Sequence, residues 1–304
     1  MTINQLELKS AVSKWLYDRF LHFVIYPSIW VAGGIASLGL FTQKVLELGD
    51  NWQPIALIFV TALIPYNLDR IFDSYVQKIP EAKAQLFFQK PYIFVFLFSA
   101  IATTALLLYY APLRVRYVSC AGIVPLLYGT PLFPWKTKSE LQWYRLKDIP
   151  GSKAWIVGTI LTYAVIALPL AYAGAKFDLA ATLTTLFMFA FIVSNSHVFD
   201  IRDVESDREK GVVTLPIMVG IKGTKLILTA MNILMLPIVI SGWITNTIAY
   251  YPEMILAVGV NLSYIWAVNA KTPRSVYSIW IEGCLFVPIL ANLAIQTFCF
   301  ISTN

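Results

Sequence analysis

Nine long hydrophobic stretches, most of them free of charged residues, constrain this chain more than any other feature of its sequence. About 20 apolar residues cross a bilayer as one helix, and inside lipid only helices or closed barrels satisfy their backbone hydrogen bonds. The stretches are continuous rather than alternating, which favours helices over barrel strands. The sequence therefore predicts an all-α, multi-pass transmembrane bundle of nine helices over residues 22–43, 53–69, 91–111, 117–134, 154–174, 179–200, 226–243, 253–270 and 276–298.

The composition excludes several classes of protein. Of the residues, 58% are hydrophobic and only 13% are charged, whereas soluble domains carry roughly 45–50% apolar and about 25% charged residues. An ordinary soluble enzyme, a disordered chain and a free nucleic-acid binder are excluded, so we expect a lipid bilayer around the chain and no nucleic-acid partner. No repeat divides the sequence, and residues 1–304 are expected to form one integral-membrane domain.

The basic residues predict the orientation of the bundle. With a cytoplasmic N-terminus, all but Lys44, Arg114, Arg116 and Lys176 of the 23 basic residues lie on the cytoplasmic side, as the positive-inside rule requires. Residues 1–21 mix aromatic, apolar and charged side chains and are expected to lie as an interfacial segment on the membrane. The membrane would be the plasma membrane or an organellar one, such as a thylakoid.

Two groups of acids close the predicted second and sixth helices. Asp69 and Asp73 are four residues apart, and Asp200, Asp203 and Asp207 follow a three-and-seven spacing. Each group therefore forms a stripe on one helical face. Like charges at this spacing repel each other, and burial near the membrane adds to the cost.

A bound cation would remove both penalties. Mg²⁺ commonly takes one or two carboxylates and completes its shell with water and substrate phosphates. Solvated acids at a bilayer surface would give a similar pattern, but two stripes on the same side, each ending a helix, favour a metal site. We therefore predict Asp69, Asp73, Asp200, Asp203 and Asp207 as ligands of Mg²⁺.

With these motifs, the chain resembles the UbiA superfamily of intramembrane prenyltransferases, whose members are nine-helix bundles with two aspartate-rich motifs after helices two and six. The second motif carries most of the resemblance. It reads Asp200-Ile-Arg-Asp203-Val-Glu-Ser-Asp207-Arg-Glu-Lys-Gly211-Val-Val-Thr214-Leu-Pro216, similar to the family's acids followed by Gly and Thr-Leu-Pro.

The first motif departs from the family pattern. The family usually has Asn four residues before the first Asp, and here that position is Pro65. Asn67 lies two residues before Asp69, about 200° round an ideal helix. It could join the site only if Pro65 breaks or bulges the helix.

The resemblance implies a donor, a metal and a reaction. A prenyl diphosphate would bind with Mg²⁺, lose its diphosphate and pass its isoprenoid chain to a lipophilic acceptor, for example an aromatic quinone precursor. Asp69, Asp203 and Lys153 would be catalytic. The diphosphate would contact Lys153, Lys147, Arg70, Arg202 and, if the helix breaks, Asn67, while Tyr128 lies in a loop expected to face the substrates.

Two further polar residues lie on the predicted helices. Glu282 falls about two turns into the ninth helix, and an acid there faces a cavity by default because burying it in lipid is costly. His197 precedes Asp200 by three residues and shares its helical face. Both are predicted on the acceptor side of the site, and structural roles are the alternative for each.

Three other functions compete with prenyl transfer. A membrane terpene cyclase of the same fold would ionise the same donor and quench the cation internally. A transporter would be expected to show repeats, broken helices and charges at the membrane midplane. A catalytically silent lipid-binding or scaffold protein would tolerate replacement of its aspartates.

Overall fold

The structure, a computed structural model, describes residues 14–76, 82–124, 133–136, 141–144, 149–209 and 211–303. Nearly all of them are helical. The elements are, in chain order, η1 (Leu21–Ile25), α2 (Ile29–Val45), α3 (Trp52–Val76), α4 (Ala82–Phe88), α5 (Tyr92–Tyr110), α6 (Leu113–Ser119), η2 (Cys120–Gly122), β1 (Phe133–Lys136), β2 (Leu141–Tyr144), α8 (Lys153–Ala173), α9 (Leu179–Glu209), α10 (Leu215–Ile244), α11 (Glu253–Ala267), η4 (Val276–Ile281), η5 (Cys284–Phe286) and α12 (Val287–Thr303).

The predicted all-α class is confirmed, apart from a short antiparallel hairpin that pairs β1 with β2. Six helices of the described residues are long and apolar enough to cross a membrane, and a bent pair makes a seventh. α11 is apolar but shorter, and the predicted span 117–134 falls largely outside the described residues. The count of nine and the cytoplasmic N-terminus therefore stay predictions.

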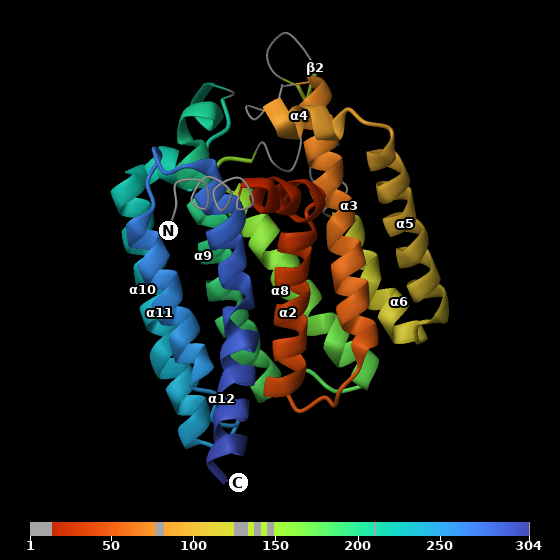
Figure 1. Ribbon diagram of the computed structural model, residues 1–304. Helices are drawn as coiled ribbons and strands as arrows, with labels where there is room; N and C mark the ends of the chain where they lie inside the picture. The colour runs from red at the N-terminus through yellow and green to blue at the C-terminus, as the bar shows by residue number, and fades with distance from the viewer. Residues whose placement is uncertain are drawn as a thin grey trace, which may run out of the picture.

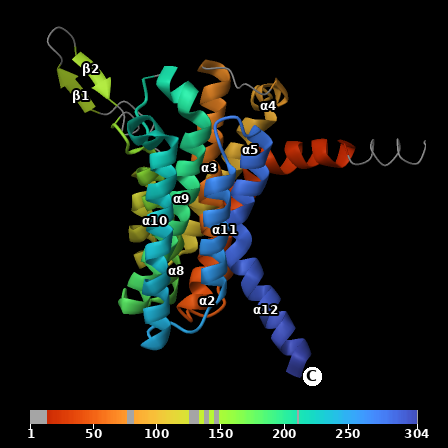
Figure 2. The same cartoon turned by 90° about the vertical axis from the view of Figure 1, so that its left-hand side faces the viewer.

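The first predicted span is not one continuous helix. A helix over Lys14–Ile25 meets α2 at an angle of 61°, and Ser28 between them has a left-handed backbone with φ of 60°. Pro27 lacks the backbone N–H that an uninterrupted helix would need at this place. The chain therefore turns near Pro27, and the N-terminal helix lies across the bundle (Figure 2).

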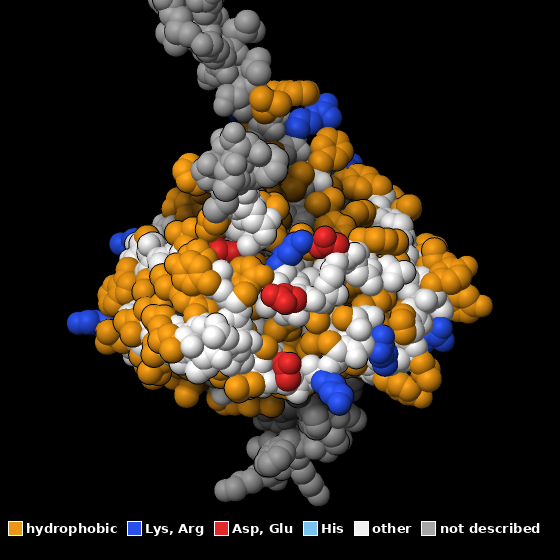
Figure 3. All heavy atoms as spheres, turned by 90° about the horizontal axis from the view of Figure 1, so that it is seen from below, with side chains coloured by type: hydrophobic (Ala, Val, Ile, Leu, Met, Phe, Trp, Pro, Cys, Tyr) orange, Lys and Arg blue, Asp and Glu red, His pale blue; other side chains and the backbone are white. Residues whose placement is uncertain are grey.

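The long helices run side by side, and their directions bring distant segments together. α3 and α9 finish, and α8 and α10 begin, at the upper end of the bundle in Figure 1. This upper end is named the motif end, because both acidic motifs lie there. Figure 3 shows the opposite end, where few charged side chains lie among hydrophobic and neutral ones.

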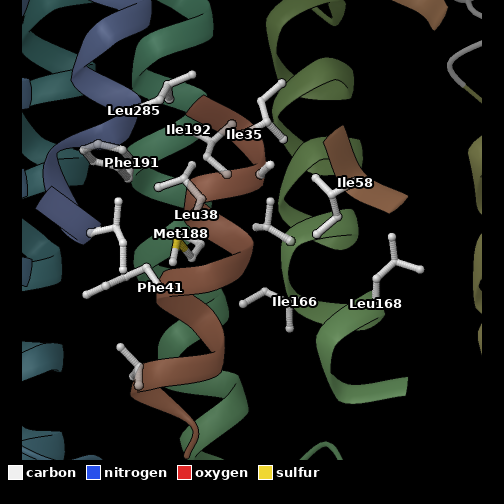
Figure 4. Packing of buried hydrophobic residues seen from close by; sticks show 14 of the residues in the cluster. Ile35, Leu38, Phe41, Ile58, Ile166, Leu168, Met188, Phe191, Ile192 and Leu285 are labelled. Atoms are coloured by element: carbon white, nitrogen blue, oxygen red, sulfur yellow. The ribbon is translucent and has the colours of Figure 1, made fainter. Parts of the chain in front are cut away.

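The core forms around α2, which packs mainly against α3 and α8. Phe41 and Leu38 of α2 are fully buried and pack near Met188 of α9, while Ile166 and Leu168 close the core from α8 (Figure 4). The outer surface is apolar as well: of the most hydrophobic window of α5, only 17% is buried within the protein. Such a surface suits contact with lipid.

Small residues allow the closest helix contacts. A Cβ at Gly158 of α8 would lie 2.4 Å from Cγ2 and 3.1 Å from Cα of Val193 in α9. In membranes, small residues at this kind of position let helix backbones approach. Gly158 therefore fixes the spacing of the two helices that carry Lys153 and the acidic stripe of α9.

We predict that Gly158→Ala lowers the unfolding free energy by about 1–3 kcal/mol, because the β-branched Val193 side chain cannot move aside without shifting α9. The control is Gly259→Ala in α11, where an added Cβ meets nothing within 4 Å. That change should be neutral or stabilise by roughly 0.5–1 kcal/mol. Thermal unfolding in detergent measures both, and equal melting temperatures for the two variants would contradict the prediction.

Candidate functional site

The acids of the second motif lie on a single helix that extends beyond its apolar part. α9 is continuous for 31 residues, so Asp200, Asp203 and Asp207 form the predicted stripe over two turns. Asp200 and Asp207 are only 3% and 5% exposed, and Asp203 is half-buried. Buried carboxylates need partners, because unpaired charges are costly to remove from water.

Lys153 supplies the partner for two of these acids. It is the first residue of α8, and α8 packs closely along α9. Its Nζ lies 3.2 Å from Oδ2 and 3.3 Å from Oδ1 of Asp207, and 3.5 Å from Oδ1 of Asp200. One ammonium group is therefore shared by two buried carboxylates that lie two turns apart on α9.

Asp203 is held by guanidinium groups. Arg202 donates two hydrogen bonds to it, from Nε to Oδ1 at 2.8 Å and from Nη2 to Oδ2 at 2.7 Å. Nη2 of Arg274 lies 3.7 Å from Oδ1 of Asp203. The Arg202 guanidinium also lies over the rings of Phe199 and Tyr277, at 5.0 and 5.5 Å from the ring centres. Such contacts fix the plane of the guanidinium.

Arg274 and Tyr277 were missed by sequence reasoning. Arg274 counted only toward the positive-inside asymmetry, and Tyr277 was one aromatic residue among many. No local spacing points to either, because they reach the stripe from a segment far along the chain.

The stripe is balanced in charge as it stands: three carboxylates face three cationic side chains. In the described part of the chain, no three His, Cys, Asp or Glu side chains meet closely enough to enclose a metal ion. The donors nevertheless fit Mg²⁺, because Asp200 and Asp207 already share one cation and Mg²⁺ takes one or two carboxylates per ion.

The first motif closes α3 at the motif end. Asp69 is exposed and Arg70 is half-buried. The side chain of Asp73 lies outside the described part of the structure. The exposed Asp69 carboxylate has no cationic partner within 4.0 Å among the described residues, in contrast to the acids of α9.

Asn67 has contacts of a different kind. α3 continues as a helix through Pro65, so the break that would turn Asn67 toward Asp69 is absent. Asn67 is fully buried, and its Nδ2 donates to the carbonyl oxygens of Pro27 at 3.0 Å and Leu63 at 2.7 Å. The bond to Pro27 attaches α3 to the turn that precedes α2.

Glu282 joins the two motifs. It is 6% exposed and lies between the π-helical η4 and the 3₁₀ turn η5, where Asn195 of α9 donates to the Ile281 carbonyl at 2.9 Å. The Glu282 carboxyl interacts electrostatically with Arg70 of α3 and Arg202 of α9. Irregular helix of this kind often marks functional sites.

Glu282 therefore lies near cations of both motifs, which places the motifs in one network of charges. Arg70 directly follows Asp69 in the sequence, and Arg202 is the ion-pair partner of Asp203. Both motifs lie at the motif end (Figure 1).

His197 lies deeper along α9. It is fully buried, its Nδ1 donates to the Val193 carbonyl at 2.9 Å, and its ring meets the edge of Trp155 at 4.7 Å. Its Nε2 has no hydrogen-bond partner among the described residues. Tyr128 and Lys147, also predicted for the site, lie outside the described residues.

A family model described as the UbiA prenyltransferase family matches residues 68–287, which include both acidic motifs, Lys153 and Glu282. A search of curated proteins gave no match.

Three solved structures share the fold. A UbiA homologue from Archaeoglobus fulgidus bound to GPP and Mg²⁺ has a TM-score of 0.60 at 10% identity, over 91% of this chain and 99% of that one. A homologue from Aeropyrum pernix K1 gives 0.58 at 14%, over 88% and 98%. A digeranylgeranylglyceryl phosphate synthase gives 0.53 at 17%, over 90% and 96%.

We predict that Lys153→Met destabilises the ligand-free protein by on the order of 3 kcal/mol, because two buried carboxylates lose their shared cation. The control is Lys44→Met. The Lys44 and Lys153 side chains are both 32% exposed, but Asp50, the partner of Lys44, is 80% exposed, against 8% for Asp207. Losing that surface pair should cost about 1 kcal/mol or less. Thermal unfolding without Mg²⁺ compares the two, and a loss no larger than that of the control would contradict the assignment.

Proposed function

The chain belongs to the UbiA prenyltransferase family, and from this premise we propose that it transfers an isoprenoid chain from a prenyl diphosphate to a lipophilic, aromatic acceptor within the membrane. The observation that carries the proposal is the meeting of both acidic motifs at one end of an apolar bundle, where Asp200 and Asp207 share a single cation. The structures from Archaeoglobus fulgidus, bound to GPP or DMAPP with Mg²⁺, support the donor class and the metal.

The two halves of such a donor need different surroundings. The isoprenoid tail is apolar and belongs among helices, while the diphosphate is a polyanion that needs cations at a polar rim. Ligands of helical bundles bind between facing helices. The motif end offers both surroundings, since the acids, Lys153 and the arginines lie above a core of aliphatic and aromatic side chains.

The metal ligands of this proposal are the five aspartates, of which Asp69, Asp200, Asp203 and Asp207 are described. Mg²⁺ bound there would neutralise the charge that grows on the leaving diphosphate. Asp69 is exposed and able to receive a hydrated ion. At Asp200 and Asp207, an ion would first have to displace the Lys153 ammonium group.

Lys153 then has a second task. With Mg²⁺ on Asp200 and Asp207, the Lys153 ammonium group would donate charge-assisted hydrogen bonds to diphosphate oxygens. Arg70 and Arg202, which flank Glu282 from α3 and α9, would add further donors, as would Lys147. Asn67 is left out of the proposal as a diphosphate donor, because both its donor bonds go to backbone carbonyls, although its buried Oδ1 has no partner among the described residues.

The chemical step is substitution at the allylic carbon. The carbon–oxygen bond breaks, the diphosphate leaves with the electron pair, and the acceptor carbon supplies the pair for the new bond and then loses a proton. In this proposal the buried Glu282 carboxylate would take that proton, and Nε2 of His197, which has no partner among the described residues, would hold a polar group of the acceptor.

We predict that Asp69→Ala abolishes release of diphosphate from a prenyl donor, while the variant stays folded because the side chain is exposed. Asp50→Ala, at the opposite end of the bundle, is the matched control and should keep full activity. Excess EDTA should stop the wild-type reaction. Assays use a panel of donors with mass spectrometry of the lipid product. Full turnover of Asp69→Ala, or turnover in EDTA, would refute the assignment.

Glu282→Gln separates the donor half of the reaction from the acceptor half. The amide fills the same space but cannot take a proton, so we expect donor ionisation and slow hydrolysis to continue while transfer to an aromatic acceptor falls at least a hundredfold. Diphosphate release and prenylated product are measured in the same sample. Equal loss of both activities would show that Glu282 serves the donor side instead.

A further inference from the structure

An open pocket lies apart from the acidic site, also at the motif end. It has a volume of about 450 Å³ and is lined by the N-terminal helix, α4 and the start of α5. Its lining residues are Trp15, Asp18, Arg19, His22, Phe23, Tyr26, Lys83, Leu86, Phe87, Lys90 and Tyr92. None of them belongs to the acidic motifs or contacts them in the network described above, so the proposed prenyl transfer leaves this cavity unexplained. It is named here the N-terminal pocket.

The N-terminal pocket carries a surplus of positive charge. Arg19, Lys83 and Lys90 line it, and its one acid, Asp18, is paired with Lys83 at 2.8 Å. Arg19 is held in place by aromatic faces, with its guanidinium 5.2 Å from the ring centre of Trp15. Two positive charges thus remain in excess, which favours an anionic ligand.

The apolar wall of the pocket is aromatic. The His22 ring meets Phe87 edge-on at 5.1 Å, and Phe87 meets Tyr92 in the same way at 5.3 Å. Aromatic side chains beside basic ones are typical of the level at which a membrane protein leaves the bilayer. The composition of the pocket therefore matches a ligand with a charged head and an apolar body.

The surroundings indicate where the apolar body would lie. Tyr92 is the first residue of α5, and the outer face of this helix continues with Val95 and Phe98, which are 69% and 71% exposed. The N-terminal helix crosses the end of the bundle beside α4 and α5 (Figure 2). An acyl chain that starts at the pocket can run down α5 with its head group against the basic residues.

We propose that the N-terminal pocket binds the phosphate head group of an anionic phospholipid. Basic clusters on interfacial helices attract acidic lipids electrostatically. Here the aromatic side chains also form a pocket wall against which the head group can bind. A free phosphate ion has the charge of a phospholipid head group but no acyl chain. It would therefore make no use of the exposed apolar face of α5.

The test is native mass spectrometry of the protein released from nanodiscs containing equal amounts of phosphatidylglycerol and phosphatidylcholine. Wild type should retain phosphatidylglycerol selectively. Arg19→Gln with Lys90→Gln should reduce that preference roughly thirtyfold, because two surface cations are lost. Lys14→Gln removes a charge from the same helix without touching the pocket and should keep the preference.

A charge-conserving variant, Arg19→Lys with Lys90→Arg, should also keep the preference for phosphatidylglycerol. This control distinguishes an effect of lost charge from an effect of misfolding. An equal fall in Lys14→Gln would show diffuse attraction and overturn the proposal, as would equal retention of both lipids by wild type. Displacement of phosphatidylglycerol by millimolar inorganic phosphate would reassign the pocket to a free anion. Prenyl transfer is measured separately, because neither assignment depends on the other.

Discussion

Carboxylates packed into an apolar helical bundle need a cation within reach, and this constraint governs the motif end. Asp200 and Asp207 are almost fully buried, and without a counter-charge they would have to be neutral or exposed. Lys153 resolves this by joining α8 to α9, and Arg202 does so for Asp203. The Lys153 pairs also fix the start of α8 against α9, whereas Arg202 and Asp203 are neighbours within α9.

Much of the fold follows from hydropathy, because a bilayer leaves a chain few alternatives to long apolar helices. The ranges predicted for α5 and α8 agree with the structure to within one residue at either end. The predicted helix ends differ from the observed ones where a helix continues into charged sequence. α9 continues to Glu209 and α10 begins at Leu215, since charged residues near a membrane surface can remain helical. The bend before α2 was missed because Pro27 lies within an otherwise apolar run.

The site was only partly predictable, for a different reason. Spacing places acids on one face of a helix, so the stripe of α9 could be read directly from Asp200, Asp203 and Asp207. Partners across helices depend on tertiary structure, which spacing does not encode. Lys153 was singled out because it opens a helix, whereas Arg274 reaches Asp203 from a distant loop. Asn67 shows the converse: its position near Asp69 in sequence suggested a ligand, but it bonds to Pro27 across the bundle.

The pairing of acids and bases at the motif end also bears on how a diphosphate would be recognised. The three acids of the stripe are already neutralised by Lys153, Arg202 and Arg274. Under the proposed function, a metal ion bound to the stripe would therefore have to displace an ammonium or guanidinium group. The displaced cations would then need a new partner, which the diphosphate would supply, so metal and diphosphate would favour each other's binding.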